Sequence, residues 1–172
     1  DYAAKTQTPI VQCSTGMSEE QLAYLRQTGE KVAVLKSANM SLGINLLMKL
    51  LKEAAQKLCT EGFDVEIVEQ HHNKKLDAPS GTALALADSV NEAMDNRFEY
   101  VYDRSQVRKQ RDKKELGISA VRGGTIVGDH EVIFAGTDEV ITFKHTAYSR
   151  AVFAKGSIAA AKFLKGKAAG MY

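Results

Sequence analysis

The stretch PIVQCSTGMSEEQLAYLRQTGEKVAVL, residues Pro9–Leu35, decides the fold class. It begins and ends with short apolar runs, Pro9–Cys13 and Lys31–Leu35, and the second is apolar enough for a strand buried on both faces. Between them, Ser18-Glu-Glu-Gln21 matches the capping box that opens a helix, which we expect to run to about Gln27. A strand, a helix and a strand with short connections predict part of a parallel, doubly wound sheet.

The middle of the chain predicts a long helix, a strand and a second helix. After Ser41, apolar residues recur at the spacing of an amphipathic helix that ends near Thr60. These residues are Ile44, Leu47, Met48, Leu51, Ala55 and Leu58. The alternating run Phe63–Val68 predicts a half-buried strand, and Ser80 as N-cap predicts a helix that continues to about Met94.

The last part of the chain predicts an antiparallel arrangement. Glycine- and threonine-containing turns separate three strand candidates, Gly117–Arg122, Glu131–Ala135 and Val140–His145. The charged stretch before them, Asp95–Glu115, predicts irregular structure. A final helix is expected to start near Ser149, and its apolar face would carry Val152, Phe153, Ile158 and Phe163.

Together these elements predict an α/β plus α+β protein. Residues 1–42 would form part of a parallel-sheet domain of the kind that binds dinucleotides. Residues 43–148 would form a mixed, largely antiparallel sheet with helices. Residues 149–172 would carry a C-terminal helix that returns to the first domain.

Composition restricts the class of protein. With 44% hydrophobic and 26% charged residues, the chain is neither disordered nor membrane-like, and no apolar run approaches the ~20 residues that cross a bilayer. The net charge of +2 is too small to indicate binding to nucleic acid. Cys13 and Cys59 lie far apart, which favours a reducing, cytoplasmic location, and both are expected to be buried or half-buried. The basic run Arg104–Lys114 predicts a solvated surface loop.

The segment EQHHNKKLDAPSGTA, residues Glu69–Ala83, concentrates the groups that could do chemistry. It is expected to form a loop that ends at the helix start Ser80-Gly81-Thr82, where unpaired N–H groups and the helix dipole suit a carboxylate or phosphate. Lysines and histidines just upstream add charge-assisted hydrogen bonds and two candidates for proton transfer. An ordinary solvent-facing loop has the same composition, so both interpretations stay open.

Other assignments of the polar residues are weaker. His71, His72 and Asp77 could bind a metal, but adjacent residues on an extended segment point to opposite sides, which suits two roles better than one shared ion. Ser80 lacks the strand-to-helix elbow of a hydrolytic nucleophile. The remaining histidines, His130 and His145, lie in strand candidates and are expected to be structural.

Two further loops, Cys13-Ser14-Thr15-Gly16 and Ser37-Ala38-Asn39-Met40, each follow a parallel-type strand. Ligands bind doubly wound sheets at the carboxyl ends of the strands, so these loops could line one face of a cofactor. Such turns are also rich in Gly, Ser and Asn for conformational reasons alone.

At HHNKKLDAPSGTA, residues His71–Ala83, the chain closely resembles the dihydrodipicolinate reductase family, also called 4-hydroxy-tetrahydrodipicolinate reductases. The family pattern HH-x-x-K-x-D-A-P-S-G-T-A is filled at every fixed position. The resemblance extends over the whole chain through five further segments, Ser14–Gly16, Ala38–Ser41, Arg122–Gly124, Gly128–His130 and His145–Arg150.

The resemblance implies a tetrameric enzyme with a Rossmann-like domain, in which residues 43–148 serve substrate binding and oligomerisation. Such enzymes act in lysine and diaminopimelate biosynthesis, where they reduce a cyclic dicarboxylate to tetrahydrodipicolinate with NADH or NADPH. It implies that His71 is the catalytic acid/base and that Lys75 is the proton donor. It implies that the substrate carboxylate is held by His72, Gly81 and Thr82. It implies cofactor contacts near the nicotinamide end from Cys13, Ser14, Thr15, Ser37, Ala38, Asn39 and Met40. No metal is expected.

The chain departs from the family pattern in three places. The glycine fingerprint G-x-x-G-x-x-G is missing, so we expect the chain to be N-terminally incomplete and inactive by itself. Met40 stands where the family commonly has Phe, and Cys13 stands where glycine is usual. The alternatives are a dicarboxylate-binding module without redox chemistry, and a metal-dependent hydrolase that uses His71, His72 and Asp77.

Overall fold

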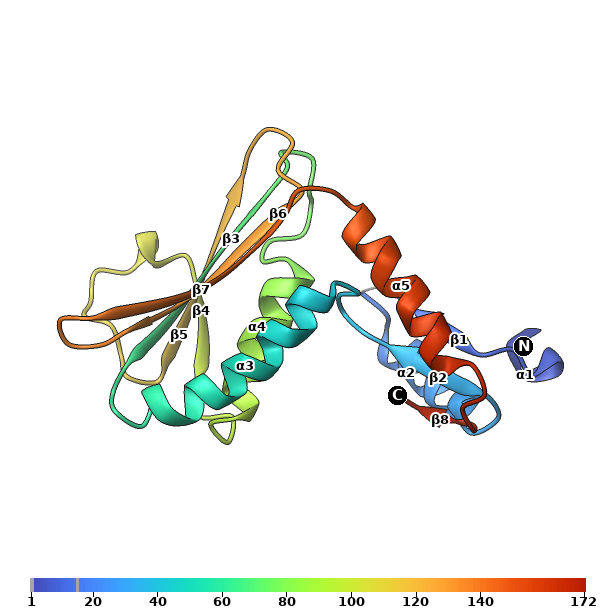
Figure 1. Ribbon diagram of the computed structural model, residues 1–172. Helices are drawn as coiled ribbons and strands as arrows, with labels where there is room; N and C mark the ends of the chain where they lie inside the picture. Colours follow the sequence, from blue (N-terminus) through green and yellow to red (C-terminus); the bar gives the residue numbers. More distant parts are fainter. Residues whose placement is uncertain (1, 15) are drawn as a thin grey trace. The chain divides into compact units, whose positions relative to one another are not determined.

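The computed structural model describes residues 2–14 and 16–172. The chain divides into two compact units, Asp1–Leu42 with Ala151–Tyr172, and Gly43–Arg150. A small parallel sheet lies in the first unit and a five-stranded mixed sheet in the second (Figure 1). The predicted α/β plus α+β class is therefore confirmed. Within the described residues, none of the helices has both the length and the apolar character needed to span a membrane.

The first unit contains the predicted strand–helix–strand. Strands β1 (Ile10–Gln12) and β2 (Ala33–Lys36) pair in parallel around helix α2 (Glu19–Gly29). Ser18 caps α2 and forms the predicted capping box, in which its side chain accepts from the Gln21 backbone and the Gln21 side chain accepts from the Ser18 backbone. Leu25, Val32 and Val34 form the buried core.

Three elements at the ends of the chain complete this unit. They are the short helix α1 (Tyr2–Thr6), the long helix α5 (Ala151–Leu164) and strand β8 (Gly170–Met171), which pairs in parallel with β2. Helix α5 passes very close to the loop after β2, because a Cβ atom at Gly156 would lie 1.6 Å from the Met40 carbonyl oxygen. Only glycine permits that approach. A strand of two residues is too short to give a periodic signal, so β8 was not predicted.

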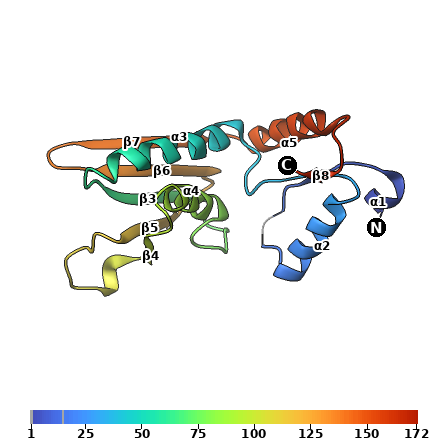
Figure 2. The same ribbon diagram turned by 90° about the horizontal axis from the view of Figure 1, so that it is seen from below.

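The second unit is a five-stranded sheet with two helices. Its elements in chain order are α3 (Leu42–Leu58), β3 (Asp64–His71), α4 (Gly81–Glu92), β4 (Glu99–Tyr102), the 3-10 turn η1 (Arg104–Gln106), β5 (Glu115–Arg122), β6 (Gly128–Ala135) and β7 (Val140–Ala147). The strand order is β4-β5-β3-β6-β7, which can be followed in Figure 2. Helices α3 and α4 lie on the same face of this sheet (Figure 1).

The core of the second unit lies between that sheet face and the two helices. Strand β3 alternates strictly between half-buried and buried residues, and Val65 and Ile67 on its buried face are fully covered. The predicted stripe of α3 is confirmed, since Ile44, Leu51 and Ala55 are completely buried. The remaining fully covered apolar residues of this core include Leu86, Val90, Leu116, Val132 and Phe134.

The sheet is less antiparallel than the sequence predicts. Strands β4, β5 and β7 run in the same direction as β3, whereas β6 runs in the opposite direction and pairs antiparallel with both β3 and β7. Strand β3 lies between β5 and β6, so the Gly-Gly-Thr turn that separates β5 from β6 does not close a hairpin. The sequence shows which segments are strands, but their order depends on pairing between distant segments.

The charged stretch Asp95–Glu115 is not wholly irregular as expected, whereas most of its basic run Arg104–Lys114 is exposed, as the predicted surface loop requires. It contains the edge strand β4, whose short, partly exposed run Glu99–Tyr102 gives a weak pattern. Its basic residues are also not all solvated, because the Arg111 side chain is only 18% exposed and donates to carboxylates of β3. Ion pairs with a distant strand cannot be read from a local run of charges.

Candidate active site

The buried face of β3 changes from apolar to polar along the strand. After Val65 and Ile67, the same face presents Glu69 and then His71, and both are buried. The strand extends three residues beyond the predicted end at Val68, so His71 lies in the sheet and not in a loop. The extension is stabilised from the neighbouring strand, where Gly123 N–H donates to His71 O at 2.9 Å.

Glu69 is the centre of this polar end. Its carboxylate is fully buried and receives a forked pair of hydrogen bonds from Arg122, at 2.7 and 2.8 Å. His71 Nδ1 lies 2.5 Å from Oε2, and the Ser80 backbone N–H donates to Oε1 at 3.0 Å. Burial alone would raise the pKa of Glu69, but the hydrogen bonds from His71, Arg122 and Ser80 outweigh it and lower the pKa to about 2. Glu69 is therefore ionised at neutral pH.

The ionised carboxylate determines how the His71 ring is used. A carboxylate only accepts hydrogen bonds, so Nδ1 of His71 carries a proton and Nε2 is the atom left to exchange one. The ring packs against Gly128, where an added Cβ atom would lie 3.0 Å from Nε2. His71 thus has a fixed orientation, with Nε2 next to the Gly128 backbone.

His130 lies beside His71 on the helix-covered face. The two ring centroids are 5.1 Å apart and the rings are nearly perpendicular. His130 Nε2 is 3.2 Å from Ser80 Oγ. Burial and the neighbouring His71 lower the pKa of His130 to about 4, so its ring is neutral at neutral pH. His130 therefore contacts Ser80 as a neutral ring, and the structural role expected for it stays a prediction.

The two adjacent histidines have different partners. His72 is half-buried, and its Nε2 lies 3.5 Å from an Arg150 nitrogen. Lys75 Nζ donates to Asp77 Oδ1 at 2.8 Å, and this hydrogen bond is the main cause that lowers the pKa of Asp77. Among residues 2–14 and 16–172, no group of His, Cys, Asp and Glu is arranged to hold a metal ion.

Hydrogen bonds join the His71–Asp77 segment to the end of strand β5, which lies beside β3. Arg122 donates to the Asp77 backbone oxygen at 2.7 Å, and Asn73 N–H donates to Gly124 O at 3.2 Å. The Arg-Gly-Gly segment at the end of β5 is therefore part of the site, which the residue patterns alone did not indicate. Its role depends on β5 lying beside β3.

Helix α4 begins next to this segment. Ser80 is its N-cap, as predicted, and its hydroxyl accepts from Ala83 N–H at 3.2 Å. Gly81 and Thr82 are half-buried in the first turn, where the helix dipole is positive. The structure thus brings together the predicted residues His71, His72, Lys75, Gly81 and Thr82 within one unit.

The predicted cofactor loops belong to the other unit. The loops after β1 and β2 meet at the carboxyl edge of the parallel sheet, where Ser37 N–H donates to Gln12 O at 3.4 Å. Ser14 and Ala38 are exposed there, and Met40 is buried. Cys13 is exposed, which contradicts the expected burial, and its Sγ lies 3.4 Å from Ser157 Oγ. Thr15 lies outside the described residues.

The loop after β2 is ordered by its own hydrogen bonds. Ser37 Oγ donates to Asn39 O at 2.7 Å and accepts from Asn39 N–H at 3.3 Å. Asn39 Oδ1 then accepts from Ser41 N–H at 2.8 Å. These contacts join the backbone of the predicted cofactor loop to its own side chains from Ser37 to Ser41.

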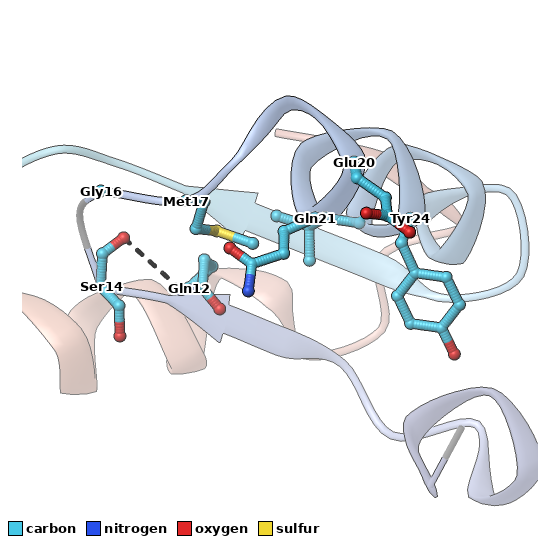
Figure 3. A pocket seen from close by; sticks show the side chains of 8 residues that line it. Gln12, Ser14, Gly16, Met17, Glu20, Gln21 and Tyr24 are labelled. Carbon is cyan, nitrogen blue, oxygen red and sulfur yellow. Dashed lines mark hydrogen bonds between the residues drawn. The ribbon is translucent and has the colours of Figure 1, made fainter.

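A cleft of about 830 Å³ lies between β1 and α2 in this unit (Figure 3). Figure 3 shows Met17 and Gln21 near Gln12 and Ser14, and Gln12 Nε2 donates to Ser14 O at 3.5 Å. Among the described residues, Ser14 is the one predicted cofactor residue that lines the cleft. The other lining residues are Gln12, Gly16, Met17, Glu20, Gln21, Tyr24 and Leu25. All of these lining residues belong to the first unit.

Comparison with known proteins identifies the family. The family description "Dihydrodipicolinate reductase, C-terminus" matches residues 43–172, and "Dihydrodipicolinate reductase, N-terminus" matches residues 1–40. A 4-hydroxy-tetrahydrodipicolinate reductase from Caldanaerobacter subterraneus subsp. tengcongensis is 55% identical over 170 residues, covering 99% of this chain and 67% of the relative. The Clostridium tetani enzyme of the same name is 52% identical over 171 residues, covering 99% of this chain and 66% of that protein.

A solved structure agrees. The dipicolinate-bound dihydrodipicolinate reductase from Paenisporosarcina sp. TG-14 superposes with a TM-score of 0.74 at 25% identity, covering 99% of this chain and 64% of that one. The chain thus spans about two thirds of the length of the relatives it matches. The names of these relatives are those of oxidoreductases, and the resemblance found in the sequence is confirmed. The chain belongs to the dihydrodipicolinate reductase family.

Proposed function

We propose that the protein containing this chain reduces 4-hydroxy-tetrahydrodipicolinate to tetrahydrodipicolinate with NADH or NADPH, a step of lysine and diaminopimelate biosynthesis. One observation carries the proposal. The complete family motif His71–Ala83 is folded so that His71 and the N-cap of helix α4 both bond to the buried carboxylate of Glu69. The names of the relatives and of the dipicolinate-bound structure support the same substrate class.

The second unit would bind the substrate. A cyclic dicarboxylate needs positive groups for two carboxylates, and the second unit offers Lys75, the Arg150 guanidinium beside His72, and the start of α4. Helix N–H groups and fixed cations orient carboxylates without consuming protons. Gly81 and Thr82 would hold one carboxylate in the first turn of α4.

The proton chemistry would fall to His71 and Lys75. Loss of the 4-hydroxyl as water would first give the conjugated C=N system of dihydrodipicolinate. The nicotinamide cofactor would supply a hydride to this system, and the electron density left on the ring would take up a proton. Lys75 would donate this proton, and His71 would act as the acid/base through Nε2. For Lys75 to reach a substrate, its hydrogen bond to Asp77 must be exchanged for one to the substrate.

The first unit would contact the cofactor. The residues present fit this role, because the two loops meet at the carboxyl edge of a parallel sheet and present the small side chains Ser14 and Ala38. A planar ring could approach such a surface. The contacts would come from Cys13, Ser14, Thr15, Ser37, Ala38, Asn39 and Met40.

The substrate site is tested by calorimetric titration with pyridine-2,6-dicarboxylate, a stable planar mimic. We expect Lys75→Ala and Thr82→Val each to weaken binding by about tenfold or more, which corresponds to about 1.4 kcal/mol. Lys74→Ala is the matched control, because Lys74 is adjacent but exposed and should leave affinity unchanged. An equal loss of affinity in the Lys74 and Lys75 variants would mean that binding depends only on general electrostatic attraction, and that Lys75 has no specific role.

The role in turnover is tested in the complete protein. Lys75→Ala should lose most of kcat, on the order of 100-fold as for removal of a positioned acid, while thermal unfolding stays close to wild type. The measurement is a steady-state assay of cofactor oxidation coupled to fresh substrate. Near-normal turnover would remove Lys75 from the catalytic residues.

The family resemblance also leads us to propose a homotetramer in the cytoplasm. Light scattering coupled to size-exclusion chromatography measures the mass of the complete protein directly. A mass four times that of the subunit is expected at micromolar concentration. A monomer that turns over at the normal rate would contradict the tetramer and leave the reaction unaffected.

A further inference from the structure

We propose that Glu69 is a positioning residue for this reaction, which holds His71 in a single tautomer and at a fixed distance from the start of α4. The inference rests on the proposed function for its catalytic meaning. The geometry on which it is built belongs to the second unit alone, so it can be tested without substrate or cofactor.

The place of Glu69 in the fold is the first argument. Glu69 follows Val65 and Ile67 on the buried face of β3, where an apolar side chain would extend the core. The position is instead occupied by a carboxylate that is fully buried. Moving a carboxylate out of water costs several kcal/mol unless strong partners compensate, so a purely structural position would favour a hydrophobic residue. The buried charge lies at the position that contacts His71.

The arrangement of its partners is the second argument. Arg122 binds both oxygens of Glu69 in a fork, which neutralises the charge. Each oxygen also accepts one further hydrogen bond, and the two donors differ. Oε2 accepts from His71 Nδ1, and Oε1 accepts from the Ser80 backbone N–H. One carboxylate therefore connects the proposed acid/base to the residue that caps the proposed carboxylate-binding helix.

The consequence for His71 follows from hydrogen-bond chemistry. The tautomer with the proton on Nε2 would place the Nδ1 lone pair against a carboxylate oxygen 2.5 Å away, which is repulsive. Neutral His71 is thus restricted to the Nδ1–H tautomer, with Nε2 next to the Gly128 backbone. Each proton that the ring takes up or releases passes through Nε2.

The consequence for α4 is a fixed separation. Ser80 is held from two sides, through its N–H by Glu69 and through its hydroxyl by His130. Gly81 and Thr82 follow directly, so the first turn of α4 cannot move relative to β3 without breaking these bonds. A rigid spacing between acid and carboxylate cradle is what an oriented substrate requires.

The first experiment reads the tautomer by long-range ¹H–¹⁵N correlation NMR on this chain. His71→Asn identifies the His71 signals among the four histidines. Wild type should show His71 as the Nδ1–H tautomer alone over its neutral range, and Glu69→Gln should show a mixture of both tautomers. Glu66→Gln is the matched control, since Glu66 lies on the same strand, also pairs with an arginine, and faces the other side.

Either of two results would overturn the proposal. If His71 in the wild-type chain is the Nε2–H tautomer, the proposal is wrong whether or not the variants fold. An unchanged Nδ1–H tautomer in Glu69→Gln would overturn it as well, because Glu69 would then only join two strands. Neither result depends on dicarboxylate binding, so failure of the proposed function remains a separate outcome.

The second experiment measures turnover in the complete protein. Glu69→Gln should lower kcat by about tenfold or more with KM little changed, because substrate contacts remain while the acid/base loses its orientation. The pH profile of kcat should shift in the same variant, Glu69→Asp should recover part of the loss, and Glu66→Gln should behave as wild type. A Glu69→Gln enzyme with normal kcat and pH profile would overturn the catalytic part.

Discussion

The two ends of strand β3 use the same chemistry for different purposes. At each end, one arginine from another segment reaches carboxylates of β3. At the carboxyl end Arg122 binds Glu69 on the helix-covered face, and at the amino end Arg111 binds Asp64 and Glu66 on the opposite face. Only at the carboxyl end does the ion pair also touch a histidine and the start of a helix.

At the amino end of β3, the ion pairs attach the loop that precedes β5 to the sheet. Arg111 donates to Glu66 at 2.8 Å and to Asp64 at 2.9 Å, and it also donates to the backbone oxygens of Val65 and Glu115. The Glu66 carboxylate occupies space that a side chain on β5 would fill, because a Cβ atom at Gly117 would lie 1.8 Å from Oε2. All these groups join the segment before β5 to the sheet.

Burial explains the difference between the ends. The side chains of Asp64 and Glu66 are about one third exposed, at 34% and 31%, so water shares in their solvation. Glu69 is completely covered, so its protein partners alone must stabilise its charge. An exposed pair can be lost at little cost, whereas a buried one holds its neighbours in place.

The largest expected effect is on stability at the buried end. Arg122→Ala leaves the Glu69 charge without its main partner and should lower the free energy of unfolding by about 3–5 kcal/mol. Urea denaturation of this chain followed by circular dichroism measures the change. A loss below about 1 kcal/mol would mean that water reaches Glu69, and the contrast between the two ends would disappear.

A slightly smaller effect should appear in acid. The pKa of Glu69 lies near 2 in the folded chain against an ordinary value of 4.5, so the unfolded chain binds the proton first as the pH falls. The stabilisation by ionised Glu69 is complete above pH 4.5 and is lost toward pH 2, amounting to about 3 kcal/mol. The difference in unfolding free energy between wild type and Glu69→Gln should therefore shrink over this window. A constant difference would contradict the lowered pKa.

The smallest effect belongs to the exposed end. Arg111→Ala should cost about 1–2 kcal/mol, because it removes several hydrogen bonds but leaves carboxylates that water can solvate. Lys113→Ala is the control, since its Nζ lies 3.5 Å from Asp64 with the side chain 79% exposed, and it should cost less than about 0.5 kcal/mol. The same denaturation assay measures both. A cost for Arg111→Ala equal to that for Arg122→Ala would remove burial as the explanation.

Local patterns predicted most elements of the fold. The capping box at Ser18, the stripe of α3 and the Ser80 N-cap are each confirmed, because their signals lie within a few adjacent turns. Strand β4 was missed because its four residues lie in a charged stretch. The position of β3 between β5 and β6 was missed because strand order depends on distant pairings.

The candidate site was predicted in part for the same reason. The residues His71 to Thr82 are contiguous, so a single motif names them. Glu69 was included in the segment but given no role, and Arg122 was noted only as part of a family-like Arg-Gly-Gly. Their function requires β5 to lie beside β3 with Arg122 opposite His71, and no local spacing specifies that register.

By itself, the sequence determined the family, the helices and the motif that holds the proposed chemistry, because each is encoded by residues close together in the chain. Only the tertiary structure decided that Glu69 is buried and shared by Arg122, His71 and Ser80. The physical reason is that burial and strand register are collective properties. They depend on which distant segments exclude water from a side chain, and the residue types alone do not contain that information.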